Sequence, residues 1–167
     1  FYIDVDMSKY IALIIDTLNH DQSISQLRYQ GYVRALAAHD LPLDPALVIE
    51  AGSFDIRQSY LAMQQHLLTG AQFTALFAIS DNMAIGAMRA LWEAGQQIPR
   101  DCSVIAIDGL TMSEYINPTL TTLCQPVEHM GRRSVEILLD MVEHRGGPIR
   151  ETAHTTLRTG ESVRDIS

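Results

Sequence analysis

Short apolar runs alternate with segments of helical periodicity over the first two thirds of the chain. The apolar runs are typical of strands buried on both faces, and they cover residues 10–15, 47–50, 73–79 and 103–107. Apolar positions at helical spacing predict helices over residues 25–41, the later part of 52–70, and 81–95. This alternation predicts an α/β fold in which helices cover both faces of a parallel sheet.

The ends of these helices carry recognisable signals. Ser53 or Asp55 is a candidate N-cap for the second helix, and Gly70 lies where a glycine commonly ends one. Gly95 stops the third helix and Pro99 follows shortly afterwards. The polar and apolar signals therefore agree on where the helices end.

The rhythm changes after residue 110. Residues 111–126 contain two prolines and predict a long irregular crossing. Residues 127–144 form an amphipathic pattern that predicts a lone helix, and the Thr-rich residues 153–160 predict a polar strand. We expect this part of the chain to be organised differently from the first part.

Several polar or aromatic residues follow the predicted strands directly. In parallel α/β sheets, ligands bind at the carboxyl ends of the strands, near helix N-termini. The residues expected at this rim are Asp16, Asn19, Phe54, Ser80, Asp81 and Asp108. Carboxylates that accept hydrogen bonds from hydroxyls, together with a ring that can stack, suit a polyhydroxylated ligand.

The same residues also have a purely structural interpretation. Ser80 or Asp81 can serve as a helix N-cap, which stabilises a helix by about 1 kcal/mol. For Asp108 the functional interpretation is favoured, because Gly109 follows and no strong helical pattern does.

Charge argues against direct binding of nucleic acid. The formal net charge is −8, and Lys9 is the single lysine. A nucleic-acid surface needs clustered Lys and Arg to displace counterions from phosphate. With 47% hydrophobic and 19% charged residues, the chain reads as globular protein that does not bind DNA by itself.

Signals for metals, cofactors and catalysis are weak. Cys102 and Cys124 are expected to be reduced thiols, and the histidines have no metal-ligand spacing. The chain has no Gly-x-Gly-x-x-Gly, no P-loop and no Gly-x-Ser-x-Gly. We therefore expect no catalytic residues, no metal and no cofactor.

The location of the protein follows from similar arguments. No apolar run reaches the ~18–20 residues of a membrane span, and no signal-peptide pattern is present. These features predict a cytoplasmic protein that does not associate with a membrane. The chain begins at Phe1 and not at Met, so we expect its natural N-terminus to be missing.

Three motifs give the chain a family resemblance. The segment FAISDNMAIGAMRALWEAGQQIPRDCSVIAIDGL resembles the core signature of the LacI/GalR family of transcription regulators. The segment NPTLTTLCQPVEHMGRRSVEILLDMV resembles the crossing segment and following helix of that family, and RYQGYVRAL resembles its Arg-x-x-Gly-aromatic helix. The motifs occur in the order that the family has, and they span nearly the whole chain.

The resemblance implies a fragment of a two-lobe protein. The family's whole protein has a helix-turn-helix headpiece and two lobes of periplasmic-binding-protein type. Residues 1–118 would then be the C-terminal lobe, and 119–147 a crossover segment and helix that pack on the missing N-terminal lobe. Residues 148–167 would be a returning strand and tail.

The resemblance also implies roles for the site residues. Arg28 corresponds to an arginine that donates to the effector, and Asp108 to a carboxylate that accepts from sugar or nucleoside hydroxyls. Ser80 matches a cleft-facing position, and Phe54 an aromatic that stacks on the ligand. Two departures leave the identity of the effector open, namely Ala106-Ile107 before Asp108 and the sequence IIDTLNHD after the first strand.

The helix over residues 81–95 is apolar almost all round, through Met83, Ile85, Met88 and Trp92. It either lies deep in the lobe or packs against a second subunit. We interpret these four residues as part of a homodimer interface, since flexible Met side chains suit such a surface.

Together these arguments predict the effector-binding and dimerisation portion of a LacI-type regulator. It would bind a small sugar or nucleoside in the cleft between the lobes, and operator DNA only through the missing headpiece. One alternative is a periplasmic sugar-binding protein of an ABC transporter or chemotaxis system. Another is an α/β hydrolase that uses Ser80.

Overall fold

The computed structural model describes residues 5–6, 22–143 and 151–164, and the chain divides into two compact units. The larger unit comprises Ser25–Cys124 and Leu157–Ser167, and the smaller comprises Phe1–Ile24 and Gln125–Thr156. The predicted strand over residues 10–15, with Asp16 and Asn19, lies outside the described residues.

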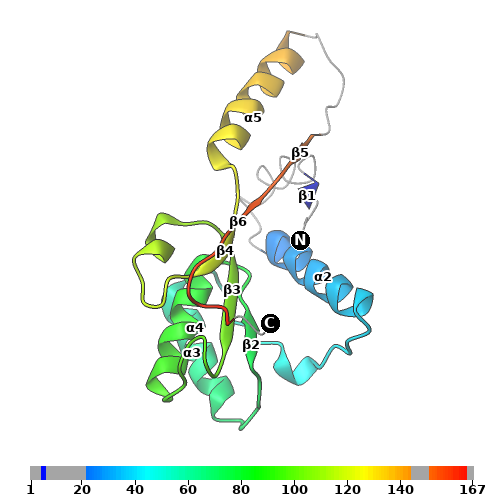
Figure 1. The fold of residues 1–167 in the computed structure, drawn as a ribbon. Helices are drawn as coiled ribbons and strands as arrows, with labels where there is room; N and C mark the ends of the chain where they lie inside the picture. Colours follow the sequence, from blue (N-terminus) through cyan, green and yellow to red (C-terminus); the bar gives the residue numbers. More distant parts are fainter. Residues whose placement is uncertain (1–4, 7–21, 144–150, 165–167) are drawn as a thin grey trace. The chain divides into compact units, whose positions relative to one another are not determined.

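The larger unit is built on a four-stranded sheet with the order β2-β3-β4-β6 (Figure 1). Its strands are β2 (Ala75–Phe77), β3 (Ser103–Asp108), β4 (Thr121–Cys124) and β6 (Thr156–Arg158). β2 and β4 both run parallel to β3, with Phe77 opposite Ile105 and Asp108 opposite Cys124. The carboxyl ends of β2, β3 and β4 therefore meet at one edge.

Helices cover both faces of this sheet. The helices are α2 (Gln22–Ala38), α3 (Ile56–Leu67) and α4 (Asp81–Glu93). Successive residues of a strand face opposite sides, and Leu76 packs against the core under α4 while the ring of Phe77 stacks on Tyr32 of α2 at 5.8 Å. The predicted α/β fold, with helices on both faces, is confirmed (Figure 1).

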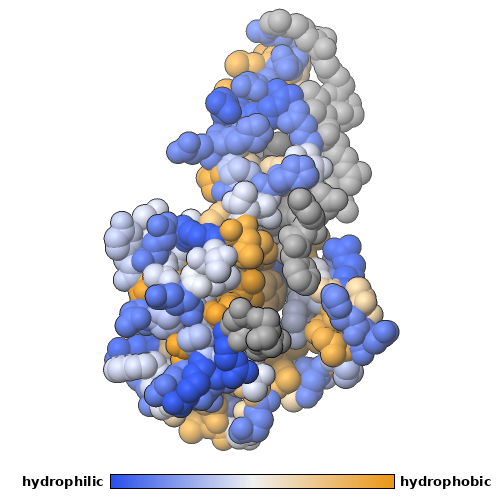
Figure 2. Space-filling model, in the orientation of Figure 1, coloured by the Kyte–Doolittle hydropathy of each residue, from blue (hydrophilic) through white to orange (hydrophobic). Residues whose placement is uncertain are grey.

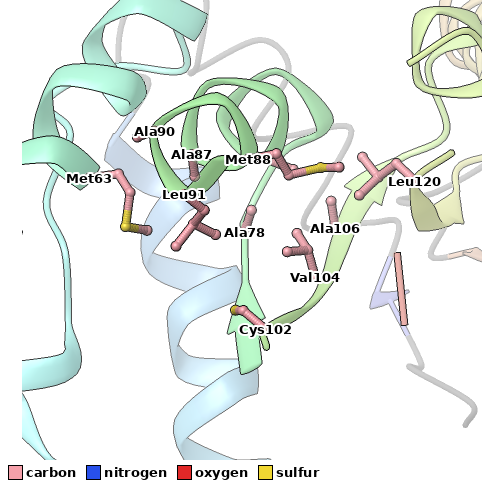
Figure 3. Close-up of a cluster of buried hydrophobic side chains, with 11 residues drawn as sticks. Met63, Ala78, Ala87, Met88, Ala90, Leu91, Cys102, Val104, Ala106 and Leu120 are labelled. Atoms are coloured by element: carbon pink, nitrogen blue, oxygen red, sulfur yellow. The ribbon is translucent and has the colours of Figure 1, made fainter. Parts of the chain in front are cut away.

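The main hydrophobic core lies between α4, α3 and the sheet. Figure 3 shows Met63 of α3 and Leu91 of α4 pointing toward Val104 and Ala106 of β3. α3 and α4 approach each other closely at Gly86, where an added Cβ would lie 2.2 Å from the carbonyl oxygen of Ile56. Only glycine allows this contact.

The predicted helix boundaries hold closely. Asp55 is the N-cap of α3 and accepts hydrogen bonds from the backbone N–H groups of Arg57 and Gln58. Gly70 and Gly95, both at positive φ, follow the ends of α3 and α4. These turns use the backbone freedom of glycine.

Two predictions about the strands are wrong. Residues 47–50 are not a strand. The short 3₁₀ helix η1 (Pro45–Leu47), with Asp44 as its N-cap, ends at the first of these residues, and Val48 follows in extended conformation. The segment 111–126, predicted to be irregular, contains the 3₁₀ helix η2 (Thr111–Glu114) and strand β4. The threonines of β4 made this strand read as polar, although Thr121 and Thr122 are buried.

The smaller unit contains a two-stranded antiparallel sheet and one helix. β1 (Val5–Asp6) pairs with β5 (Thr152–Ala153), and α5 spans Val127–Val142. The helix predicted over 127–144 is therefore confirmed, whereas the single strand predicted over 153–160 is two short strands, β5 and β6. Arg133 of α5 donates from Nε to both carboxylate oxygens of Glu151 at 2.8 Å.

α5 exposes most of its large apolar side chains. Met130 and Ile137 are buried. The exposed residues are Val127, Val135, Leu138, Leu139, Met141 and Val142. Hydrophobic surface is visible over α5 at the top of Figure 2.

Candidate functional site

Arg28 and Asp108 form an ion pair at the carboxyl edge of the sheet. Arg28 projects from α2, and its Nη2 donates to Oδ1 of Asp108, at the end of β3, over 2.8 Å. Its Nη1 donates to the carbonyl oxygen of Ile79, just after β2. The arginine side chain is 7% exposed and that of Asp108 is 23% exposed. One guanidinium therefore bridges the ends of two strands and leaves part of the carboxylate open to solvent.

The Nε–H group of Arg28 differs from the other two nitrogens of the guanidinium. Its Nε is buried and makes no hydrogen bond to any of the described residues. A buried donor left unpaired costs about 1–3 kcal/mol. Such a group in a native structure calls for an explanation.

The backbone at Asp108 is strained. Its φ is +143°, which is unusual for a residue other than glycine, and Gly109 follows at +80°. Strained backbone of this kind clusters at ligand-binding and active sites. Gly109 is also pressed against β4, since an added Cβ would lie 2.6 Å from Sγ of Cys124. The turn therefore needs glycine directly after the carboxylate.

The electrostatic environment of Asp108 is mixed. Burial raises the pKa of its carboxyl group above the usual 3.8, and the nearby charge of Asp81 acts in the same direction. The charge and hydrogen bond of Arg28, and the backbone N–H of Asp81, oppose that increase in pKa. The result is a partly exposed acceptor beside a fixed cation, which suits ligand hydroxyl groups.

Ser80 and Asp81, predicted to contact an effector, are both held by hydrogen bonds within the chain. Ser80 is almost completely buried and is the N-cap of α4, where its Oγ accepts from the N–H of Met83 at 3.2 Å. Asp81 is completely buried, and its oxygens accept from Leu110 N at 2.7 Å and Thr122 Oγ1 at 2.5 Å. Both side chains are buried in this structure. The structural alternative, a helix N-cap, applies to Ser80, whereas Asp81 is the first residue of α4 and bonds to groups from other elements.

Phe54 lies at the same end of the helical layer as Ser80. Ile56, at the start of α3, contacts Gly86 of α4. Further along both helices, the hydroxyl of Tyr60 in α3 donates a hydrogen bond to the carboxylate of Glu93 in α4. The two helices therefore run in the same direction and start at the same end, with Phe54 just before α3. Phe54 is half-buried, and no hydrogen bond or ring contact among the described residues joins it to Arg28 or Asp108.

The four residues predicted at a dimer interface do not share one exposed face. Met88 is part of the buried core, and Met83 packs against that core. Ile85 is half-buried, and only Trp92, at 64%, is strongly exposed. The guanidinium of Arg89 lies 4.9 Å from the centre of the Trp92 ring. Met88 is buried within the larger unit in the single chain, and its place at a dimer interface stays a prediction.

The cysteines are free thiols. Cys102 is buried, which raises the pKa of its thiol to about 11, and Cys124 is half-buried. Within the described part of the chain, no cluster of His, Cys, Asp or Glu could hold a metal ion. None of the described helices is both long and apolar enough to cross a membrane.

Sequence reasoning missed Thr122 and the loop amide of Leu110. Both bond to Asp81, and Thr122 belongs to the LTTLCQP motif, which supports the family resemblance. The role of Thr122 could have been predicted from the pair of threonines followed by an apolar residue, because this pattern is typical of a strand with buried hydroxyls.

Comparison with known proteins identifies the domain. The model of the periplasmic binding protein-like domain matches residues 8–163. This chain belongs to that domain family. Among its curated relatives, the ribose operon repressor of Haemophilus influenzae is 35% identical over 130 residues, which are 78% of this chain and 39% of the repressor.

Solved structures of periplasmic binding protein-like domains agree. A sugar-binding transcriptional regulator of the LacI family from Escherichia coli, complexed with phosphate, is 32% identical with a TM-score of 0.78, and the match covers 87% of this chain and 52% of the regulator. A LacI-family regulator from Enterococcus faecium with bound ribose is 30% identical with a TM-score of 0.70, over 84% and 52% of the two chains. The resemblance to LacI-type regulators is confirmed. The chain spans about two fifths of the curated relative and about half of each solved structure.

Proposed function

We propose that this chain is the effector-binding portion of a LacI-type transcriptional regulator and that it binds a small sugar. The observation that carries this proposal is the ion pair between Arg28 and the partly exposed carboxylate of Asp108 at the carboxyl edge of the sheet. A sugar hydroxyl can donate to this carboxylate, and a second hydroxyl oxygen can accept from a guanidinium N–H on Nη1 or Nη2 that is not used in these contacts. The planar fork of arginine suits this kind of simultaneous contact.

Phe54 remains a candidate for stacking on the effector. Its place just before α3 is compatible with this role, because α3 and α4 start at the same end of the helical layer. A sugar is favoured over a nucleoside by its relatives, which include a ribose operon repressor and a regulator with bound ribose. A nucleoside effector stays as the alternative.

A thermal-shift screen of sugars and nucleosides on the full-length protein tests the class of effector. A ligand present at 100 times its Kd stabilises the folded state by about 2.7 kcal/mol, which raises the melting temperature measurably. Stabilisation by pentoses or hexoses supports the proposal. Stabilisation by nucleosides alone favours the alternative, and no shift with either class contradicts effector binding.

We propose that the effector site lies between two lobes and that most of the second lobe is outside this chain. α5 exposes apolar side chains, and the chain spans about half of its solved relatives. We propose that α5 completes an N-terminal lobe and that residues 25–124 belong to the C-terminal lobe. Since β4 pairs with β3 in the larger unit, we place the start of the crossing at Gln125 and not at residue 119.

The regulatory mechanism then follows from linkage. A sugar that binds one arrangement of the two lobes more tightly shifts the population toward it, by no more than its differential affinity. Operator DNA would be bound only by a helix-turn-helix headpiece outside this chain, in the cytoplasm, and the chain itself would catalyse no reaction. A helix-turn-helix encoded upstream supports this proposal, whereas a secretion signal there supports a periplasmic sugar-binding protein.

We also propose that the full-length protein is a homodimer. Trp92 keeps its place as a candidate interface residue because it is strongly exposed. A second candidate surface is formed by Leu110, Met112 and Tyr115 around η2, which are also exposed. Light scattering on Trp92→Asp and Tyr115→Asp variants distinguishes the two surfaces, since only the variant at the interface becomes monomeric, and a wild-type monomer contradicts the proposal.

A further inference from the structure

Asp81 connects three elements around the strained turn that carries Asp108. It is the first residue of α4, directly after the N-cap Ser80. One carboxylate oxygen accepts from the backbone N–H of Leu110 at 2.7 Å, and the other accepts from the hydroxyl of Thr122 in β4 at 2.5 Å. Both partners are polar groups that folding has brought together from distant parts of the sequence.

The turn after β3 is fixed on both sides of Leu110. Asp81 holds the N–H of this residue, and Nη2 of Arg158 donates to its carbonyl oxygen at 2.8 Å. Asp108 and Gly109, immediately before it, have φ values of +143° and +80°. A strained backbone persists only when its surroundings over-determine it, and these two contacts provide that constraint.

The identity of residue 81 fits this role. A completely buried carboxylate is costly unless its oxygens are hydrogen-bonded, and both oxygens of Asp81 are. It accepts a hydrogen bond from each of two donors that face it from different elements. The helix N-terminus at which it lies also favours a negative charge.

We propose that Asp81 is a positioning residue of the effector site, whose carboxylate fixes the turn Asp108–Leu110 so that the carboxylate of Asp108 is held beside Arg28 for the effector. Asp81 acts through Asp108 and does not touch the ligand. This inference rests on the proposed function, because it takes Asp108 as an effector contact.

The test compares matched variants of the full-length protein. Asp81→Ala removes both hydrogen bonds, and Asp81→Asn keeps one acceptor oxygen. Thr122→Val removes the hydroxyl at nearly constant volume, and Thr122→Ser keeps it. Asp101→Ala is the control, since Asp101 accepts from the N–H of Gln97 at 2.8 Å but precedes β3 at its other end.

The first readout needs no ligand. Hydrogen exchange at single-residue resolution compares the amide of Leu110 with that of Val104, which bonds Ser162 in the body of the sheet. We expect Leu110 to exchange at least tenfold faster in Asp81→Ala, with Val104 unchanged. Thr122→Val should have a smaller effect, while Thr122→Ser and Asp101→Ala should match the wild type. An unchanged Leu110 amide, or equal acceleration of both amides, overturns the proposal.

The second readout is the affinity for D-ribose, measured by calorimetry. We expect a loss of about tenfold or more in Asp81→Ala, a smaller loss in Thr122→Val, and recovery in Thr122→Ser. Because Asp81 acts through Asp108, the double variant Asp81→Ala/Asp108→Ala should bind no more weakly than Asp108→Ala alone. Losses that multiply in the double variant show an independent contact and overturn the positioning role.

The failure of the two proposals can be told apart. If no sugar binds the wild type, the proposed function fails. The positioning role of Asp81 is then tested without a ligand, by the hydrogen exchange rate of the guanidinium protons of Arg28. These protons should exchange faster in Asp81→Ala, because a loosened turn moves Asp108 away from Arg28. Protected Arg28 protons in that variant overturn the inference.

Discussion

Helices α4 and α5 both carry many large apolar side chains, but they meet different surroundings. α4 buries Ala84, Ala87, Ala90 and Leu91 under α3 and against the sheet. α5 buries Met130 and Ile137 and leaves an apolar stripe that includes Leu138 and Leu139 exposed. Apolar side chains on a helix therefore show that the helix needs a partner, but not that the partner lies in the same chain.

The largest expected effect contrasts one leucine from each helix. Leu91 is 0% exposed, whereas Leu138 is 60% exposed. Leu91→Ala should lower the free energy of unfolding of this chain by about 2–5 kcal/mol, because it leaves a cavity in the core. Leu138→Ala should change it by less than about 0.5 kcal/mol. Urea denaturation of both variants checks this.

The contrast between α4 and α5 can also be tested with Leu138→Ala in the full-length protein. If α5 packs on a second lobe there, Leu138→Ala should cost about 1–3 kcal/mol, close to the value of burying a leucine. An equal, negligible effect in the short chain and in the full-length protein would show that the exposed stripe of α5 has no intramolecular partner.

A second contrast uses glycine. Gly86→Ala would place a Cβ against backbone and side-chain atoms of α3, so we expect a loss of about 1–3 kcal/mol or more from overpacking. Gly131 lies in α5 and has no atom within 4 Å of an added Cβ. Gly131→Ala should instead stabilise by about 0.5–1 kcal/mol through helix propensity. Equal shifts in the urea midpoints of the two variants would contradict the close packing of α3 on α4.

The smallest expected effect concerns two aspartates near opposite ends of β3, the strand on which α4 packs. Arg100, and then the backbone N–H of Gln97, lower the pKa of Asp101 to about 2. Its stabilising contribution is therefore present above pH 3.8 and is lost as the pH falls toward 2.

The pKa of Asp108 is shifted in the opposite direction from that of Asp101. Burial raises the pKa of this group above 3.8, so the native state binds its proton more readily than the unfolded state. Its contribution to stability falls as the pH rises from 3.8 through the raised pKa. Urea midpoints between pH 2 and 6 should respond in opposite directions to Asp101→Asn and Asp108→Asn. Parallel pH profiles for the two variants would contradict the assigned environments.

Periodicity and punctuation were enough to predict much of the fold. The helices α2, α3, α4 and α5 and the strands β2 and β3 follow from apolar spacing, with Asp55, Gly70 and Gly95 marking helix ends. β4 was missed because its buried threonines look polar until Asp81 and Ser162 satisfy their hydrogen-bonding groups. Such partners are distant in sequence and appear only after folding.

The candidate site shows the same limit. The rule that ligands gather at strand ends pointed to Asp108, and the motif around Arg28 supplied its partner. The sequence could not show that both Ser80 and Asp81 are buried, because the burial of Asp81 depends on the position of β4 and of the Leu110 loop. It also could not show that Met88 turns inward, since α4 is apolar on nearly every side.

Calorimetric titration of D-ribose into the full-length protein tests the central claim most directly. Removing a charged hydrogen-bonding group that contacts a ligand costs about 1.5–3 kcal/mol, which corresponds to a loss in affinity of roughly tenfold to a hundredfold. We therefore expect Arg28→Ala and Asp108→Ala each to weaken binding by this factor, with Asp101→Ala as a folded control of unchanged affinity. Wild-type affinity in both Arg28→Ala and Asp108→Ala would contradict the account.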